Sequence, residues 1–250
     1  MIVGVLKEVL DGENRVAVTP QTVKDLLKSG LEVHIQAGAG ESSFISDSDY
    51  ENSGARIIAD ASSILSNSDL TIKLETATLD EIDQLKKGSA NISFIQTTRE
   101  TEAVKKLTQK NISAFSMHLI PRTTLAQSMD ALSSQANVAG YKAVITGAMH
   151  LPVYMPLLMT AAGTIPPAKV LIIGAGVAGL QAIATAKRLG AQVEAFDVRP
   201  EVKEQVESLG AKFVEVASES EEGVGEGGYA KETSDDYKDC LLYTSPSPRD

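Results

Sequence analysis

Short apolar runs alternate with helix-like segments through the first half of the chain. The runs predict strands at Ile2–Val5, Leu31–Gln36, Leu70–Leu74, Asn91–Ile95 and Ile112–Met117. Helix-like segments lie between them at Pro20–Lys28, Ala61–Ser66, Leu79–Leu85 and Thr101–Gln109, with a polar helical stretch at Asp47–Ser53. This alternation predicts a parallel sheet covered by helices on both faces.

A longer helix-like segment follows. Apolar and small residues recur at helical spacing from Leu125 to Met149, with an interruption at Gly140. A helix of this length after a complete α/β unit is typical of a connector between domains. The next segment is rich in proline and leads through the link TAAGTIPPAK, so we expect interdomain helices over 125–165.

The alternation of strands and helices then resumes. We expect strands at Lys169–Ile173, Gln192–Phe196 and Lys212–Val216, with helices up to Leu189 and over Pro200–Ser208. This is one half of a doubly wound nucleotide-binding sheet, and a complete one needs about three further strands. The remaining residues begin as an acidic, glycine-rich loop and end in Ser-Pro-Ser-Pro. We therefore expect a truncated second domain.

These patterns together predict an α/β protein with two doubly wound parallel-sheet domains. The first, residues 1–124, is expected to be flavodoxin-like. The second, residues 166–239, is expected to be a partial Rossmann domain with a mobile loop over 218–233. Residues 240–250 have no helical or strand periodicity, and we expect them to be a non-native tail.

Composition limits the possible partners and compartment. The chain has 250 residues with 33 acids and 23 bases, which argues against nucleic acid or an anionic membrane surface as the main partner. A single cysteine, Cys240, excludes an internal disulfide and indicates a reducing compartment. No uninterrupted apolar stretch of about 20 residues is present. We expect a cytoplasmic chain that contacts a membrane only through partners.

Three glycines carry the strongest chemical signal. Gly174, Gly176 and Gly179 have G-x-G-x-x-G spacing and lie between a predicted strand and a predicted helix. Gly174 allows a tight turn, Gly176 allows close approach of a pyrophosphate, and Gly179 allows the helix to pack closely on the sheet. The helix opens with Val177 and Ala178, and its free N–H groups suit a phosphate. A purely structural turn is the alternative.

An acid closes the strand that follows this helix. Asp197 comes 18 residues after Gly179 and is placed to accept hydrogen bonds from an adenosine ribose. Its charge would also repel a 2′-phosphate, which favours NAD(H) over NADP(H). Arg199 lies two residues later and weakens that preference, and we include Val198 with both in the candidate cofactor site.

Three segments carry a family resemblance. They are PRTTLAQSMDALSSQANVAGYKAV (121–144), TAAGTIPPAKVLIIGAGVAGLQA and FDVRPEVKEQVESLG. They resemble the soluble NAD(H)-binding domain of proton-translocating NAD(P)⁺ transhydrogenases, and the resemblance runs from Met1 to about Tyr237. Alanine dehydrogenases share the implied fold and the pattern ENRVAVTP. One departure is Leu125, where the family commonly has a basic residue.

The resemblance implies a nicotinamide site upstream of the glycines. Arg122, Gln127, Asp130 and Ser133 match the loop that holds the nicotinamide and its ribose beside a second nucleotide. The neighbouring Ser128 and Met129 join the implied cofactor contacts. Gly228 and Tyr229 match a mobile loop that closes over bound nucleotide.

The resemblance also implies partners. In the family, NADH gives its hydride to NADP⁺ on a separate NADP(H)-binding domain, and a membrane domain couples this transfer to proton movement. We therefore expect a homodimer that is peripheral to the inner membrane through partner subunits and is inactive alone.

Two other functions stay open. An alanine dehydrogenase-like enzyme would use basic residues at Arg15 and Lys73 for a substrate carboxylate, and a histidine where this chain has Gln96. For these two cations and Lys7 we favour either a solvated position or a structural ion pair. A non-catalytic NAD-sensing module is the second alternative. The three histidines lack metal-ligand spacing, so no metal is expected.

Overall fold

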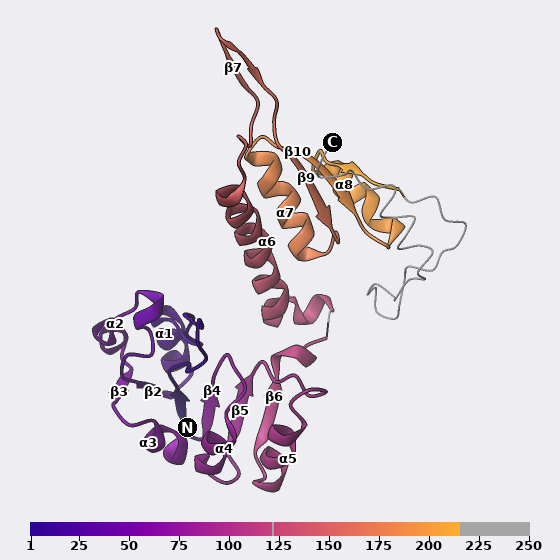
Figure 1. The fold of residues 1–250 in the computed structure, drawn as a ribbon. Helices are drawn as coiled ribbons and strands as arrows, with labels where there is room; N and C mark the ends of the chain where they lie inside the picture. The colour runs from indigo at the N-terminus through magenta and orange to yellow at the C-terminus, as the bar shows by residue number, and fades with distance from the viewer. Residues whose placement is uncertain (122, 216–250) are drawn as a thin grey trace. The chain divides into compact units, whose positions relative to one another are not determined.

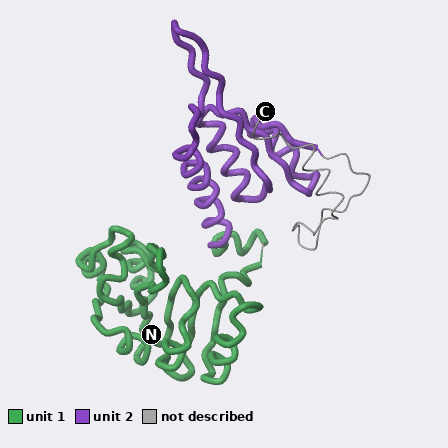
Figure 2. The backbone as a smooth tube through the Cα atoms, viewed as in Figure 1, with its two compact units in different colours: residues 1–130 green, residues 131–250 purple. Residues whose placement is uncertain are grey.

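The computed structural model describes residues 1–121 and 123–215, which belong to two compact units (Figures 1 and 2). The first unit is Met1–Asp130, and the second begins at Ala131. The α/β class and the parallel sheets are confirmed in both units.

The first unit has a parallel sheet of six strands in the order β3-β2-β1-β4-β5-β6. The strands are β1 Ile2–Val5, β2 Glu32–Gln36, β3 Arg56–Ile58, β4 Leu70–Ile72, β5 Ala90–Ser93 and β6 Ser113–Ser116. The α-helices are α1 Pro20–Lys28, α2 Asp47–Asn52, α3 Ala61–Asn67, α4 Leu79–Gln84 and α5 Thr101–Gln109. Short 3₁₀ helices are η1 Glu41–Ser43, η2 Met117–Leu119 and η3 Thr124–Met129. Val3 of β1 pairs with Val33 of β2 and Leu70 of β4, so β1 and β4 lie where the strand order reverses.

The first sheet has one strand more than the flavodoxin-like domain that the sequence predicts. Without β3 the order would be β2-β1-β4-β5-β6, which is the flavodoxin arrangement. With β3 beyond β2, the sheet has the order of a dinucleotide-binding fold. The periodicity did not reveal β3 because it is a three-residue edge strand with no fully buried side chain.

Two apolar clusters form the core of the first unit. One contains Leu6, Ile64 and Ile82. The other contains Val5, Ile35 and the fully buried Tyr50, whose hydroxyl donates to the carbonyl oxygen of Val18 at 2.7 Å. Burial raises the pKa of Tyr50 to about 12. Val5 and the following Leu6 belong to different clusters, so an apolar layer packs on each face of the sheet.

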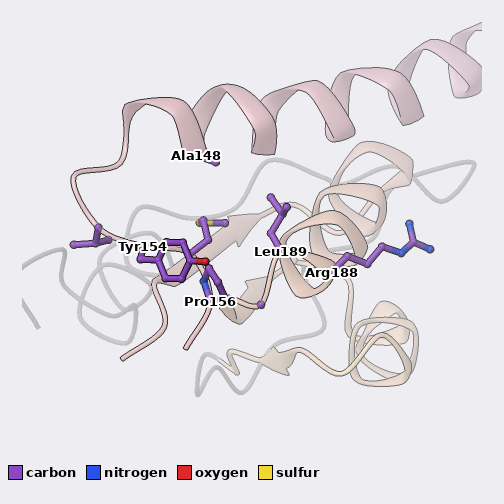
Figure 3. Close-up of a pocket in the computed structure, with 8 residues that line it drawn as sticks. Ala148, Tyr154, Pro156, Arg188 and Leu189 are labelled. Carbon is purple, nitrogen blue, oxygen red and sulfur yellow. The ribbon is translucent and has the colours of Figure 1, made fainter. Parts of the chain in front are cut away.

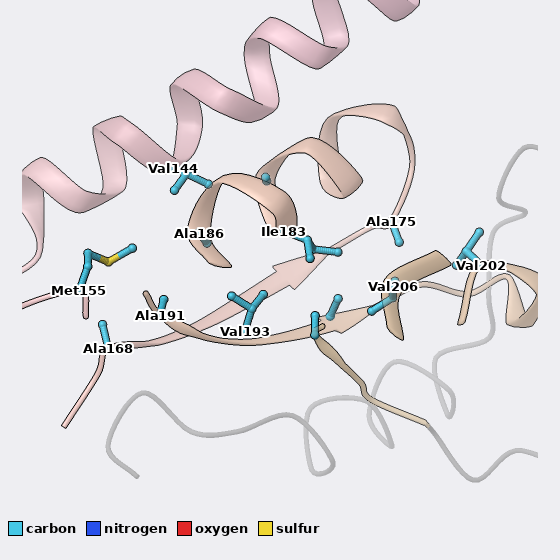
Figure 4. Packing of buried hydrophobic residues seen from close by; sticks show 13 residues of the cluster. Val144, Met155, Ala168, Ala175, Ile183, Ala186, Ala191, Val193, Val202 and Val206 are labelled. Carbon is cyan, nitrogen blue, oxygen red and sulfur yellow. The ribbon is translucent and has the colours of Figure 1, made fainter. Parts of the chain in front are cut away.

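The second unit has a parallel sheet of three strands in the order β11-β10-β9. Its elements are β9 Lys169–Ile173, α7 Val177–Arg188, β10 Gln192–Phe196, η4 Pro200–Val202, α8 Lys203–Ser208 and β11 Lys212–Phe213. The long helix α6 Ala131–His150 packs beside α7 (Figure 1). Val144 of α6 and Ile183 of α7 meet Val193 of β10 in one buried cluster (Figure 4).

Close backbone contact joins α6 to α7. A Cβ atom at Gly140 would lie 2.0 Å from the carbonyl oxygen of Ala178, so only glycine fits at this position. The contact places the middle of α6 against the first turn of α7.

The expected helices over 125–165 are only partly present. The segment predicted as one helix from Leu125 to Met149 breaks at Asp130, whose φ of −77° and ψ of 76° are not helical. Residues 158–165 are not helical either, because β7 Leu158–Thr160 and β8 Gly163–Ile165 pair as an antiparallel hairpin. Gly163, with φ of +142°, permits the tight turn that the pattern of prolines obscured.

Candidate functional site

The glycine turn lies between β9 and α7. Gly174 has φ of +94°, in the left-handed region, and its N–H donates to the carbonyl oxygen of Phe196 at 2.7 Å. A Cβ atom at Gly179 would lie 1.8 Å from the carbonyl oxygen of Gly174, so a side chain at 179 would push the helix off the turn. The two outer glycines therefore hold the first turn of α7 close to the end of β9.

The middle glycine faces open space. A Cβ atom at Gly176 would find no heavy atom closer than Nη2 of Arg199, at 3.9 Å. Gly176 is the N-cap of α7 and provides no side-chain hydrogen bond, and the first turn contains no acid. An uncapped helix N-terminus has free N–H groups and a positive dipole end, which favour an anion such as a phosphate. Val177 and Ala178 form the first turn at this position.

Asp197 is buried directly beside the turn. Its Oδ2 accepts the N–H of Ala175 at 2.7 Å, and its Oδ1 accepts the N–H of Arg199 at 2.9 Å. The guanidinium of Arg199 adds bonds from Nε to Oδ1 at 2.9 Å and from Nη2 to Oδ2 at 3.0 Å. The side chain of Asp197 is 5% exposed and that of Arg199 is 20% exposed.

These contacts keep the pair ionised. Burial alone would raise the pKa of the Asp197 carboxyl, but hydrogen bonds from Arg199 and Ala175 outweigh burial and lower it below its ordinary value. The same hydrogen bonds raise the pKa of the Arg199 guanidinium. The sequence predicted Asp197 at this place but not its enclosure by Arg199.

The predicted nicotinamide residues divide between the two units. Gln127, Ser128 and Met129 lie in η3, and Asp130 ends it, all in the first unit. Ser133 lies in the first turn of α6, in the second unit with the glycine turn. The predictions for Arg122, Gly228, Tyr229, the loop 218–233 and the tail 240–250 lie outside the described residues.

The cations of the N-terminal unit are paired with acids. Nζ of Lys73 contacts both carboxylate oxygens of Glu81, at 2.9 and 2.8 Å, and the lysine side chain is only 1% exposed. Arg15 pairs with Glu13 at 2.6 Å, and Lys7 lies 3.8 Å from Glu41. Each of these three cations thus lies beside an acid of the first unit, and of the three only Lys73 is buried.

A buried acid bridges the point where the order of the six strands reverses. Glu8 follows β1, and its carboxylate accepts the N–H groups of Leu74 and Glu75, which follow β4, at 2.7 and 3.3 Å. Burial raises the pKa of Glu8. The crevice at a strand-order reversal is the usual ligand site of such sheets. Here the side chain of Glu8 joins the segments after β1 and β4 on the two sides of this crevice. The sequence did not predict this contact.

An open cavity of about 560 Å³ lies at the C-terminal end of α7. Tyr154 lies across it, whereas Arg188 points away from it (Figure 3). The 12-residue helix separates this cavity from the glycine turn by roughly 18 Å. The lining is mainly apolar and includes Val153, Met155, Pro156 and Leu189. The cavity is therefore distinct from the candidate nucleotide site.

Residues 1–121 and 123–215 contain neither a metal-ligand cluster nor a membrane-spanning helix. Within these ranges, no three histidine, cysteine, aspartate or glutamate side chains converge as metal ligands would. No helix in the same ranges has the length and apolar character needed to cross a bilayer.

Comparison with known proteins gives consistent matches along the chain. The family model described as alanine dehydrogenase/PNT, N-terminal domain, matches residues 4–139. The corresponding C-terminal domain model matches residues 143–232.

The individual proteins to which the chain is similar include transhydrogenase subunits. NAD(P) transhydrogenase subunit alpha of Haemophilus influenzae is 47% identical over 237 residues, covering 95% of this chain and 46% of that protein. An NAD(P) transhydrogenase alpha-subunit chain of Rhodospirillum rubrum is 46% identical over 244 residues, covering 95% and 64%. A solved transhydrogenase from Sinorhizobium meliloti has a TM-score of 0.83 at 47% identity, covering 87% and 65%. The chain thus spans between about half and two thirds of the length of these proteins.

Proposed function

This chain belongs to the alanine dehydrogenase/PNT family, and from that premise we propose that it is the NAD(H)-binding component of a proton-translocating transhydrogenase. In this role NADH bound here transfers a hydride to NADP⁺ on a partner domain, giving NAD⁺ and NADPH. A membrane domain couples the transfer to proton movement.

The uncapped start of α7 carries the nucleotide-binding part of this proposal. Open space above Gly176 and the free N–H groups of the first turn match the needs of a pyrophosphate. Asp197 lies beside the same turn, at the distance along the chain where a ribose-binding acid is expected. The bound form is proposed to be NAD(H) because this carboxylate is ionised and would repel a 2′-phosphate.

The nicotinamide end is assigned to the segment before α6. We assign Gln127, Asp130 and Ser133, with Arg122, to holding the nicotinamide and its ribose, supported by Ser128 and Met129. The loop containing Gly228 and Tyr229 is assigned to closing over the nucleotide. Direct hydride transfer between two nicotinamides needs alignment and exclusion of water rather than an acid or base.

The buried lysine argues against an amino-acid dehydrogenase. Oxidation of an amino acid needs a cation for the substrate carboxylate and a proton acceptor. Lys73 is neutralised by Glu81 and has almost no exposed surface. Gln96 stands where the family resemblance implies a histidine in alanine dehydrogenases, and its amide side chain is not a proton acceptor of that kind. The backbone N–H of Gln96 donates to Oε2 of Glu100 at 2.6 Å. Transhydrogenation requires neither group.

The proposed assembly is a homodimer that meets the membrane through partner subunits. Every residue of β7 and β8 is exposed, although the strands include Leu158, Met159 and Ile165. An apolar hairpin of this kind is typical of an interface. Sedimentation of Met159→Glu should give monomers if the hairpin joins two copies, and an unchanged dimer would contradict that surface.

The enzymatic proposal can be tested by reconstitution. The full-length protein is mixed with NADH and an NADP⁺ analogue bound to the NADP(H)-binding domain of a family member. We expect hydride transfer that Asp130→Asn slows, while the exposed change Asp80→Asn in α4 leaves the rate unchanged. Absence of transfer, together with oxidation of NADH that depends on pyruvate and ammonium, would refute the proposal.

A further inference from the structure

The carboxylate of Asp197 has no vacant place for a ribose. An ionised carboxylate offers about four lone-pair positions. Oδ1 accepts the backbone N–H and Nε of Arg199, and Oδ2 accepts the N–H of Ala175 and Nη2 of Arg199. All four positions are occupied, so a ribose hydroxyl can bind Asp197 only by replacing one of these donors.

The four donors differ in how easily they can leave. Two are backbone N–H groups, fixed by the turn after β9 and by the end of β10. The other two belong to one guanidinium, which a rotation of the Arg199 side chain would withdraw together. That side chain is 20% exposed, and its Nη2 lies 3.9 Å from the Cβ position of Gly176. The guanidinium thus lies at the approach to the glycine turn.

We propose that Arg199 is a placeholder for the nucleotide: it occupies the ribose-binding oxygens of Asp197 in the free protein, and the adenosine ribose displaces it. This inference rests on the proposed binding of NAD(H) at the glycine turn. Before binding, the guanidinium compensates a carboxylate that would otherwise be buried with unused acceptors. After binding, the ribose hydroxyls take that role and the guanidinium turns outward to solvent.

A placeholder has an unusual energetic signature. It stabilises the free protein and competes with the ligand, so its removal lowers stability and raises affinity at the same time. Removal of a residue that merely positions Asp197 would lower both the stability of the free protein and its affinity for the nucleotide. Removal of a residue that binds the nucleotide would lower the affinity, with little effect on the stability of the free protein.

The test uses Arg199→Met, which keeps the length of the side chain and removes its donors. Titration calorimetry of the full-length protein should give NADH affinity about three- to tenfold higher, since hydrogen bonds to a charged group are strong but this one is partly solvated. The thermal midpoint of the free protein should fall. Arg56→Met is the matched control, because its pair with Glu32 is exposed and lies in the first unit, and it should change neither quantity.

Three results from nucleotide binding would overturn the placeholder. The first is weaker NADH binding by Arg199→Met. The second is a selective loss of NADPH binding, which would make Arg199 a 2′-phosphate ligand. The third is a crystal structure of the NADH complex in which the guanidinium still holds both oxygens of Asp197. If the unmodified protein binds no NADH, the proposed function fails instead. In that case an unchanged thermal midpoint of the free Arg199→Met protein would still refute the placeholder.

Discussion

Glu81→Gln isolates the charge of a buried ion pair in the first unit. Glu81 accepts Nζ of Lys73 at 2.8 and 2.9 Å, and it also closes a capping box at the start of α4 with Thr78. Glutamine can preserve the capping box, because a side-chain amide oxygen accepts the same backbone N–H. The substitution therefore removes the counter-charge of Lys73 and little else.

The expected cost follows from burial. The side chain of Lys73 is 1% exposed and that of Glu81 is 16% exposed, so the ammonium would be left in the interior with only the nearby carboxylate of Glu8 to compensate its charge. Breaking a buried pair from one side typically costs about 3–5 kcal/mol. Thr78→Ala removes only the cap and should cost about 1 kcal/mol. The double variant with Lys73→Met removes both charges and should recover much of the loss.

Urea denaturation followed by circular dichroism measures these differences. Hydrogen exchange of peptides covering 70–84 would show whether the loss is local to β4 and α4. If Glu81→Gln costs no more than Thr78→Ala, or if the double variant is no more stable than Glu81→Gln alone, the reasoning about the buried charge is refuted.

Three further predictions concern the second unit. Gly179→Ala should lower the free energy of unfolding by about 1–3 kcal/mol because its Cβ would overlap Gly174. Gly176→Ala should leave the free energy of unfolding nearly unchanged and weaken NADH binding in calorimetry. If the two variants lost the same stability, the described geometry of the turn would be contradicted. Gly140→Ala should destabilise the α6–α7 contact, whereas Gly147→Ala, whose Cβ would meet nothing within 4 Å, should stabilise α6 by up to about 1 kcal/mol. Thermal unfolding measures both changes, and a Gly140→Ala protein more stable than Gly147→Ala would refute the close contact. The lowered pKa of Asp197 adds stability that is present above the unfolded value near 3.9 and is lost as pH falls through the folded pKa. The difference in thermal midpoint between the parent and Asp197→Asn should therefore shrink below about pH 4, and a constant difference in acid would contradict this.

Much of the fold could be predicted because strands and helices leave different periods in the sequence. Ile2–Val5, Pro20–Lys28 and Lys169–Ile173 have the bounds that their patterns indicate. Prediction failed where local signals are weak. The edge strand β3 has three residues, and the hairpin β7–β8 has exposed apolar residues that fit no buried face.

The candidate site likewise has features that could be predicted from the sequence and features that could not. The glycine turn and Asp197 could be predicted because their spacing is fixed by a strand, a helix and a second strand. The enclosure of Asp197 by Arg199, and the bridge that Glu8 makes to Leu74 and Glu75, depend on side-chain rotation and burial. A sequence pattern contains no information on either.

In each of the two parallel sheets a helix follows the first strand, but the N-termini of these two helices are capped differently. After β1, helix α1 is capped by the hydroxyl of its own Thr19 and has Pro20, which lacks an N–H, in its first turn. After β9, helix α7 has only Gly176 at its cap. The chain itself caps the N-terminus of α1, whereas the N-terminus of α7 has no side-chain cap and can accept a ligand. A saturation titration should therefore reach one dinucleotide per chain, although the fold contains two sheets of nucleotide-binding type.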